Sequence, residues 1–128
     1  MNEAGHRATS EVDPWSCLVI LIDSNLSTSI RNQHLLLELW GAGIRDAKLR
    51  DDGEQQWAWY RELFLTMVVE GCNKGAFRPT LSPEDVVDML LAILAGAMVQ
   101  RVLQVRAPMP DHFRTALLHL LTQMLGRA

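Results

Sequence analysis

The stretch Ser82–Gln104, SPEDVVDMLLAILAGAMVQRVLQ, decides the fold of this chain. It begins like a helix, because the Ser82 side chain can cap the first turn and Pro83 suits a first position that needs no N–H donor. From residue 89 to residue 99 no side chain is polar. This part of the helix therefore has no polar face, and a helix without a polar face is expected to be buried all round.

Small side chains on this central helix form a narrow ridge at Ala92, Gly96 and Val99, where another backbone could come close. We expect the chain's own helices to cover one side and a second molecule to cover the other. A membrane span is the rival interpretation. The apolar run 86–99 is interrupted by Asp88 and falls short of the roughly 20 residues that a bilayer requires, so the pattern favours the core helix of a soluble all-α domain.

Composition and length predict one globular domain. The chain has 128 residues, 48% of them hydrophobic, and a net charge of -3, which gives no basic footprint for nucleic acid. Cys17 and Cys72 form no CxxC motif and are expected to be reduced core thiols of a cytoplasmic protein. Residues 1–12 lack the apolar segment of a signal peptide. We expect them to be a disordered leader, followed by a domain over residues 13–126.

Helical spacing and start signals predict four further helices, and no alternating strand pattern of useful length is found. Asp13 and Asp46 are the expected caps of the first and third helices, and Gly75 is a candidate left-handed position after the third. The apolar run of the first helix ends at Ile22, before residues 23–25 weaken it. The other predicted helices cover residues 30–46, 47–73 and 111–126.

Three segments in succession resemble the C-terminal domain of TetR-type transcriptional regulators. They are Leu37-Glu-Leu-Trp40 leading to Ile44-Arg-Asp46, then Trp57 to Pro79, which contains Glu70-Gly71 and Gly75-Ala-Phe-Arg-Pro79, and finally Leu90 to Leu103. The resemblance covers roughly residues 14 to 125. It implies an all-α, five-helix effector-binding domain whose last two helices pair with those of a second chain in a dimeric four-helix bundle. One departure is Ala95, where many family members have Asp.

The expected homodimer interface combines the ridge of the central helix with the apolar face of the last helix. Its predicted residues are Ala92, Gly96, Val99, Leu103, Phe113, Leu117, Leu120 and Met124.

Family members carry a helix-turn-helix domain in front of this region, and the few residues before Pro14 leave no room for one. The basic residues Arg45, Lys48 and Arg50 alternate with acidic ones, which is typical of a solvated helix junction. We therefore expect contact with DNA only through a helix-turn-helix domain that lies outside this chain.

Catalytic signals are weak. His112 and His119 share a helix face, but no third ligand lies near them in the sequence, so the zinc interpretation has little support. His34 and Glu38 are one turn apart, which fits either acid–base chemistry or a surface pair. No nucleophile elbow, phosphate-binding glycine loop or HExxH motif is found. We expect no enzyme activity, no metal and no cofactor.

Aromatic residues are concentrated in the first three predicted helices, which the resemblance implies enclose the effector cavity. By pattern alone such residues are more often core. We expect Gly41 and Gly43 to thin the cavity wall, and a Tyr60 hydroxyl and an indole N–H to orient a neutral apolar or aromatic effector. The predicted ligand-binding residues are Ile22, Leu36, Trp40, Trp57, Tyr60, Phe64, Met67 and Met98.

Two hypotheses of different classes remain from the sequence. The chain is either the ligand-sensing and dimerisation domain of a TetR-type regulator, or a stand-alone dimeric protein. The stand-alone protein would bind a small molecule, or would pair with full-length relatives and remove them from DNA.

Overall fold

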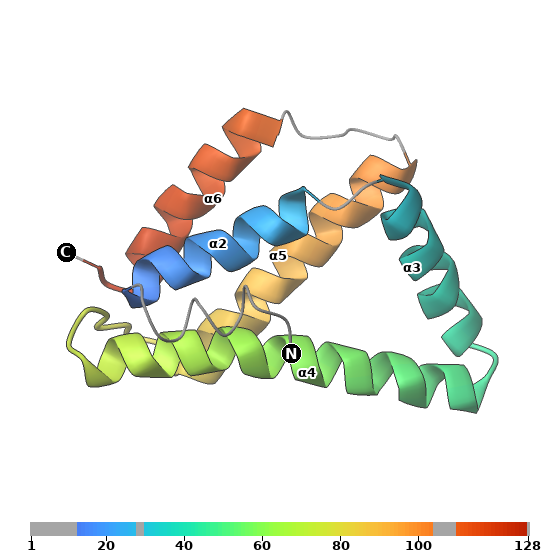
Figure 1. Cartoon of the computed structure of the whole chain (residues 1–128), viewed down its shortest axis with the longest axis horizontal. Coiled ribbons are helices and arrows are strands. Elements are labelled where there is room, and N and C mark those ends of the chain that lie inside the picture. Colours follow the sequence, from blue (N-terminus) through green and yellow to red (C-terminus); the bar gives the residue numbers. More distant parts are fainter. Residues whose placement is uncertain (1–12, 28–29, 104–109, 128) are drawn as a thin grey trace.

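The computed structural model describes residues 13–27, 30–103 and 110–127, and every regular element within these ranges is a helix (Figure 1). The helices are α2 (Pro14–Leu26), α3 (Ile30–Gly43), α4 (Ala47–Asn73), α5 (Pro83–Leu103) and α6 (Pro110–Met124). The five-helix, all-α prediction is confirmed. The first helix continues to Leu26 instead of weakening after Ile22. The predicted leader, residues 1–12, lies outside the described residues.

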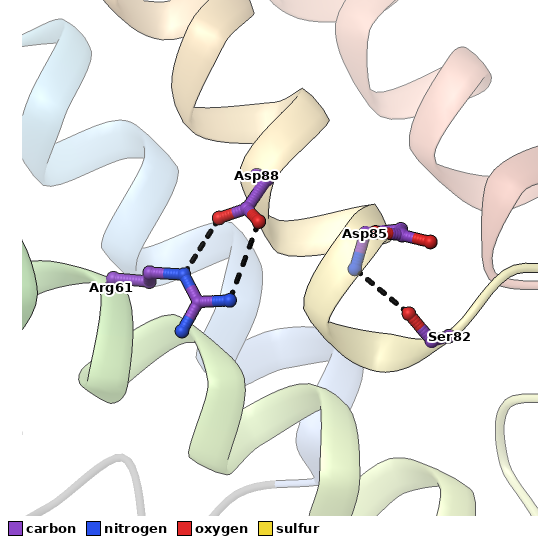
Figure 2. Close-up of polar contacts among 4 residues, drawn as sticks. All are labelled: Arg61, Ser82, Asp85 and Asp88. Atoms are coloured by element: carbon purple, nitrogen blue, oxygen red, sulfur yellow. Dashed lines mark hydrogen bonds and ion pairs between the residues drawn. The ribbon is translucent and has the colours of Figure 1, made fainter.

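The predicted N-terminal caps are present. A carboxylate oxygen of Asp13 accepts the Ser16 N–H at 2.9 Å, and the Asp46 side chain accepts backbone N–H groups of the first turn of α4. The Ser82 hydroxyl accepts the Asp85 N–H at 3.1 Å (Figure 2). Each cap satisfies a donor that the helix itself leaves unpaired. The hydrogen bond from Ser16 also lowers the pKa of Asp13 below its ordinary value of 3.8.

Two helices end in the same glycine motif. Gly75 follows α4 with φ 75°, and Gly126 follows α6 with φ 60°. In both, the N–H of the glycine and the N–H of the next residue donate to carbonyls in the last turn of the helix, which is the Schellman arrangement. The ends also meet, because the Arg78 N–H donates to the Leu125 carbonyl at 2.7 Å and the Arg78 carbonyl lies against Gly126. The loop before α5 is thereby tied to the end of α6.

Helix α4 is the common base on which α2, α3 and α5 pack (Figure 1). In its last turns Gly71 leaves room for the Phe77 ring, which an added Cβ would overlap. The core lies among α2, the second half of α4, α5 and α6. Its largest fully buried side chains are Leu18, Ile22, Phe64, Met67, Val68, Phe77, Val86, Val87, Leu90, Leu121 and Leu125.

Two arginine–carboxylate pairs join helices that are distant in the sequence. Arg61 on α4 binds both oxygens of Asp88 on α5, at 2.6 and 3.3 Å (Figure 2). Arg114 on α6 binds both oxygens of Asp23 on α2, at 2.6 and 3.0 Å. Two-pronged contacts of this kind fix orientation as well as distance. The hydrogen bond from Arg61 lowers the pKa of Asp88.

Helix α5 has 21 residues and is long and apolar enough, by length and composition, to cross a membrane. The argument from length against a membrane span therefore does not hold. Packing is more informative, because the core helix of a globular domain passes the same test. One side of α5, with Val87, Leu90 and Leu94, is buried against the chain's own helices, and about 33% of the apolar window of α5 is buried in total. The single chain therefore covers α5 on one side and not all round, as the sequence had suggested.

Candidate functional site: a cavity between α3, α4 and α5

A cavity of about 150 Å³ lies between α3, α4 and α5, with the end of α2 at its edge. Its position agrees with the expectation that the first three predicted helices and the inner face of the central helix surround a pocket. The lining residues are Asn25, Gln33, Leu36, Trp40, Gly53, Gln56, Trp57, Tyr60, Leu91, Leu94, Ala95 and Met98.

Aromatic rings form the walls on the α3 and α4 sides. Trp40 and Trp57 meet edge to face, with ring centroids 5.9 Å apart and an angle of 75° between the ring planes. Tyr60 stacks on Phe64 at a centroid distance of 5.6 Å. Because Phe64 is fully buried, it supports Tyr60 from the core side. Edge-to-face and stacked pairs are the preferred aromatic geometries, so the rings of these walls support one another.

The α5 side of the cavity is apolar. Leu91, Leu94, Ala95 and Met98 face it from successive turns. Ala95, the position at which the sequence departs from the family pattern, is thus a wall residue. Its methyl group gives a ligand nothing to hydrogen-bond, and the adjacent Met98 supplies a flexible surface.

Gly53 on α4 is the glycine that borders the cavity. A Cβ added there would meet only the Trp40 ring, at 4.0 Å. Gly41 and Gly43, which were expected to thin the cavity wall, are not among the lining residues of this cavity, and Gly43 borders the second hollow described below. An added Cβ at Gly41 meets nothing within 4 Å, and one at Gly43 meets the Arg50 backbone at 3.3 Å in the turn to α4.

The polar groups of the lining are neutral. Asn25, Gln33 and Gln56 contribute amides and Tyr60 a hydroxyl, and none of the described lining residues carries a charge. Burying an ion without a partner is costly. The cavity therefore suits an uncharged molecule.

Five of the eight predicted ligand-binding residues line the cavity: Leu36, Trp40, Trp57, Tyr60 and Met98. The other three, Ile22, Phe64 and Met67, are not among the lining residues and lie in the hydrophobic core, each at most 1% exposed.

The sequence prediction missed several lining residues that share a helix face with predicted ones. Gln33 lies one turn before Leu36 and two turns before Trp40 on α3. Gly53 and Gln56 lie one turn before Trp57 and Tyr60 on α4. Helical spacing places residues 3, 4 and 7 apart on one face, so this periodicity was the available signal. The prediction selected large apolar and aromatic residues, so it passed over Gln33 and Gln56, which are polar, and Gly53, which is small.

A second, more open hollow of about 430 Å³ borders the same two indole rings. It shares Trp40, Gly53 and Trp57 with the first and is bordered by the charged side chains of Arg50 and Glu54. Arg50 is already engaged, since it donates to the Gly43 and Ile44 carbonyls at 2.9 and 3.1 Å. The second helix was predicted to reach residue 46, but α3 ends at Gly43, and Ile44 lies past its end and is 77% exposed. We regard the first cavity, which is the less open of the two, as the better ligand site.

The remaining chemical candidates are ordinary surface or core groups. His34 and Glu38 form an exposed pair at 3.5 Å, and His112 and His119 are exposed. Among the described residues, no three His, Cys, Asp or Glu side chains are grouped as a metal site requires. Cys17 is buried and Cys72 is half-buried, and neither forms a disulfide. Burial raises the pKa of Cys17 and of Cys72, which disfavours the reactive thiolate.

The outer side of α5 carries exposed apolar residues. Ala92 and Gly96 are exposed, Val99 is half-buried and Leu103 is 58% exposed. Met89, one turn before Ala92, extends this face. The small ridge therefore faces away from the chain's own core.

The predicted contacts on α6 divide into two groups. Leu120 is 42% exposed, whereas Leu117 is buried in the chain's own core. Phe113 and Met124 are partly buried and pack against that core. Leu120 and the ridge of α5 are the predicted interface residues most open to a partner.

Comparisons with known proteins bear on this architecture. The family model of BetI-type transcriptional repressors, C-terminal, matches residues 18–126. Comparison with curated proteins and with solved structures gave no match. Because the matched region covers most of the chain, the protein belongs to the BetI-type family of TetR transcriptional regulators, through the C-terminal domain of that family.

Proposed function

We propose that this chain senses a small, uncharged, apolar or aromatic effector and forms a homodimer, as the regulatory part of a TetR-type repressor that acts in the cytoplasm. Membership of the family supports a regulatory, ligand-binding and dimerising role in general. In this proposal DNA is bound through a helix-turn-helix domain that is separate from the residues described above.

The observation that carries the sensing proposal is the cavity itself. It joins α3, α4 and α5 and has two indole rings and a phenol ring in its wall. A ligand there would touch all three helices at once. Its binding energy could therefore bias how α3 and α4 sit against α5, and a regulatory ligand acts by favouring one arrangement over another.

The dimer proposal depends on the exposed ridge of α5. An added Cβ at Gly96 meets nothing within 4 Å, so the partner's backbone can come close. Together with Leu103 and Leu120, this ridge offers an apolar face that a second copy can cover with the same residues, as a two-fold axis requires. Sedimentation at micromolar concentration should show a species of twice the 14.4 kDa chain mass.

Ligand-linked stability tests the sensing function. A compound that binds only the folded chain raises the free energy of unfolding by RT ln(1 + [L]/Kd), about 2.7 kcal/mol at a hundredfold excess over Kd. We would screen uncharged one- and two-ring compounds by thermal unfolding. Trp40→Ala should lose the response. Trp59→Ala is the matched control, because Trp59 is 49% exposed and lies outside the lining.

Two results would contradict the proposal. One is a screen in which no uncharged compound stabilises the wild-type chain. The other is a compound that stabilises Trp40→Ala as much as it stabilises Trp59→Ala, because it would bind elsewhere.

A further inference from the structure

Gln33 on α3 is an unusual buried residue. Its side chain is only 6% exposed. Among the described residues, Gln33 is the only polar residue that is buried. Its Oε1 atom is inaccessible, and no described protein group donates a hydrogen bond to it. The same residue lines the cavity, next to Leu36 and Trp40 on one face of α3.

A buried amide oxygen without a protein partner weakens a fold, since nearly all buried polar groups in native proteins are hydrogen-bonded. Methionine has a similar length and an equal helix propensity and would fill this place without that cost. A polar residue that is unfavourable for stability and faces a cavity is the pattern expected of a group that serves binding.

The size and polarity of the site narrow the ligand class. A closed apolar cavity of about 150 Å³ holds one benzene molecule. The cavity here has about that volume and is partly open to solvent, so it has room for one ring. Its described lining residues carry no charge. The Gln33 amide has an acceptor and a donor. Oε1 is inaccessible as the amide is placed, and turning the amide by 180° exchanges the positions of acceptor and donor. A hydroxyl group both donates and accepts, so it can bind the amide in either orientation.

We propose that Gln33 recognises a hydroxyl group, so that the preferred ligand is a neutral one-ring compound of the phenol type and not a hydrocarbon. This inference rests on the proposed sensing function of the cavity. Gln33 determines specificity, while the indole rings and the α5 wall bind the ring of either kind of ligand.

Phenol and toluene are the probes, because they have similar size and differ in the hydroxyl group. We would measure both dissociation constants by isothermal titration calorimetry for the wild-type chain, Gln33→Met and the control Gln55→Met. Gln55 is exposed on α4 and outside the lining. The ratio Kd(toluene)/Kd(phenol) should fall about tenfold in Gln33→Met, equivalent to one hydrogen bond of about 1.4 kcal/mol. Gln55→Met should keep the wild-type ratio.

The outcomes separate this inference from the function on which it rests. If both probes bind and Gln33→Met keeps the wild-type ratio, the role of Gln33 is refuted and the apolar pocket stands. If neither probe binds the wild-type chain up to its solubility, and the wider screen also fails, the pocket function falls and the inference falls with it. If Gln33→Met does not fold, Gln33→Leu replaces it. This variant also removes the amide, so the same change in the ratio Kd(toluene)/Kd(phenol) is expected.

Discussion

Replacing Gly53 by alanine should make the chain more stable and less able to hold a ligand. Gly53 lies within α4, where glycine costs about 0.5–1 kcal/mol relative to alanine. The new Cβ would meet the Trp40 ring at 4.0 Å, an ordinary contact without strain. Urea unfolding should therefore show a gain of that size, and the melting temperature of a chain of this length should rise by about 2–4 °C.

The ligand response should change in the opposite direction. The added methyl group occupies space between the Trp40 ring and the rest of the cavity, so the stabilisation by an uncharged aromatic compound should shrink. Gly53→Leu, which fills more of the cavity, should abolish it. Gly41→Ala is the matched control, because it removes a helical glycine where an added Cβ meets nothing within 4 Å. If Gly53→Ala and Gly41→Ala respond equally to the ligand, the cavity beside Gly53 is not the binding site.

Two further variants test the dimer face and the α4–α5 contact. Gly96→Leu should shift the chain toward the monomer in sedimentation velocity, because a large side chain on the ridge keeps the partner away, typically at a cost of about 1–3 kcal/mol. An unchanged dimer would show that another surface pairs. Asp88 has its pKa lowered by Arg61, so its contribution to stability is complete above the ordinary carboxyl pKa of 3.8 and is lost as the pH falls through the lower folded value. Asp88→Asn should therefore flatten the acid limb of stability against pH, and a limb as steep as that of the wild type would refute this assignment.

Local chemistry made the helix boundaries largely predictable. Asp13, Asp46 and Ser82 each cap a helix within a few residues of themselves, and Gly75 takes the left-handed conformation after α4. These are short-range effects that a sequence displays directly. The continuation of α2 beyond Ile22 was not predictable in this way. Asp23, which looked like a weak point in the helix, binds Arg114 from α6, a contact between residues 91 positions apart.

The division between cavity and core depended on packing that no local pattern contains. One inward stripe runs along α4 from Gly53 through Trp57 and Tyr60 to Phe64 and Met67. Its first part borders the cavity, and its second part is buried in the core. Helical spacing gives the same signal for both parts. The two parts of the stripe differ in the helix that packs on them. Helix α3 packs on α4 at one end of the stripe, and α2 packs on it at the other end.

The apolar character of α5 has a structural explanation in its three surroundings. Leu90 faces the chain's own core, Leu94 and Met98 border the cavity, and Gly96 faces outward on the ridge. If a second copy covers the ridge, no side of α5 faces water, and the helix needs no polar stripe. The cavity wall and the ridge are then two different faces of the same helix. A ligand that displaces α5 from α3 or α4 would move the proposed dimer contact with it, which gives the cavity a direct physical route to the partner chain.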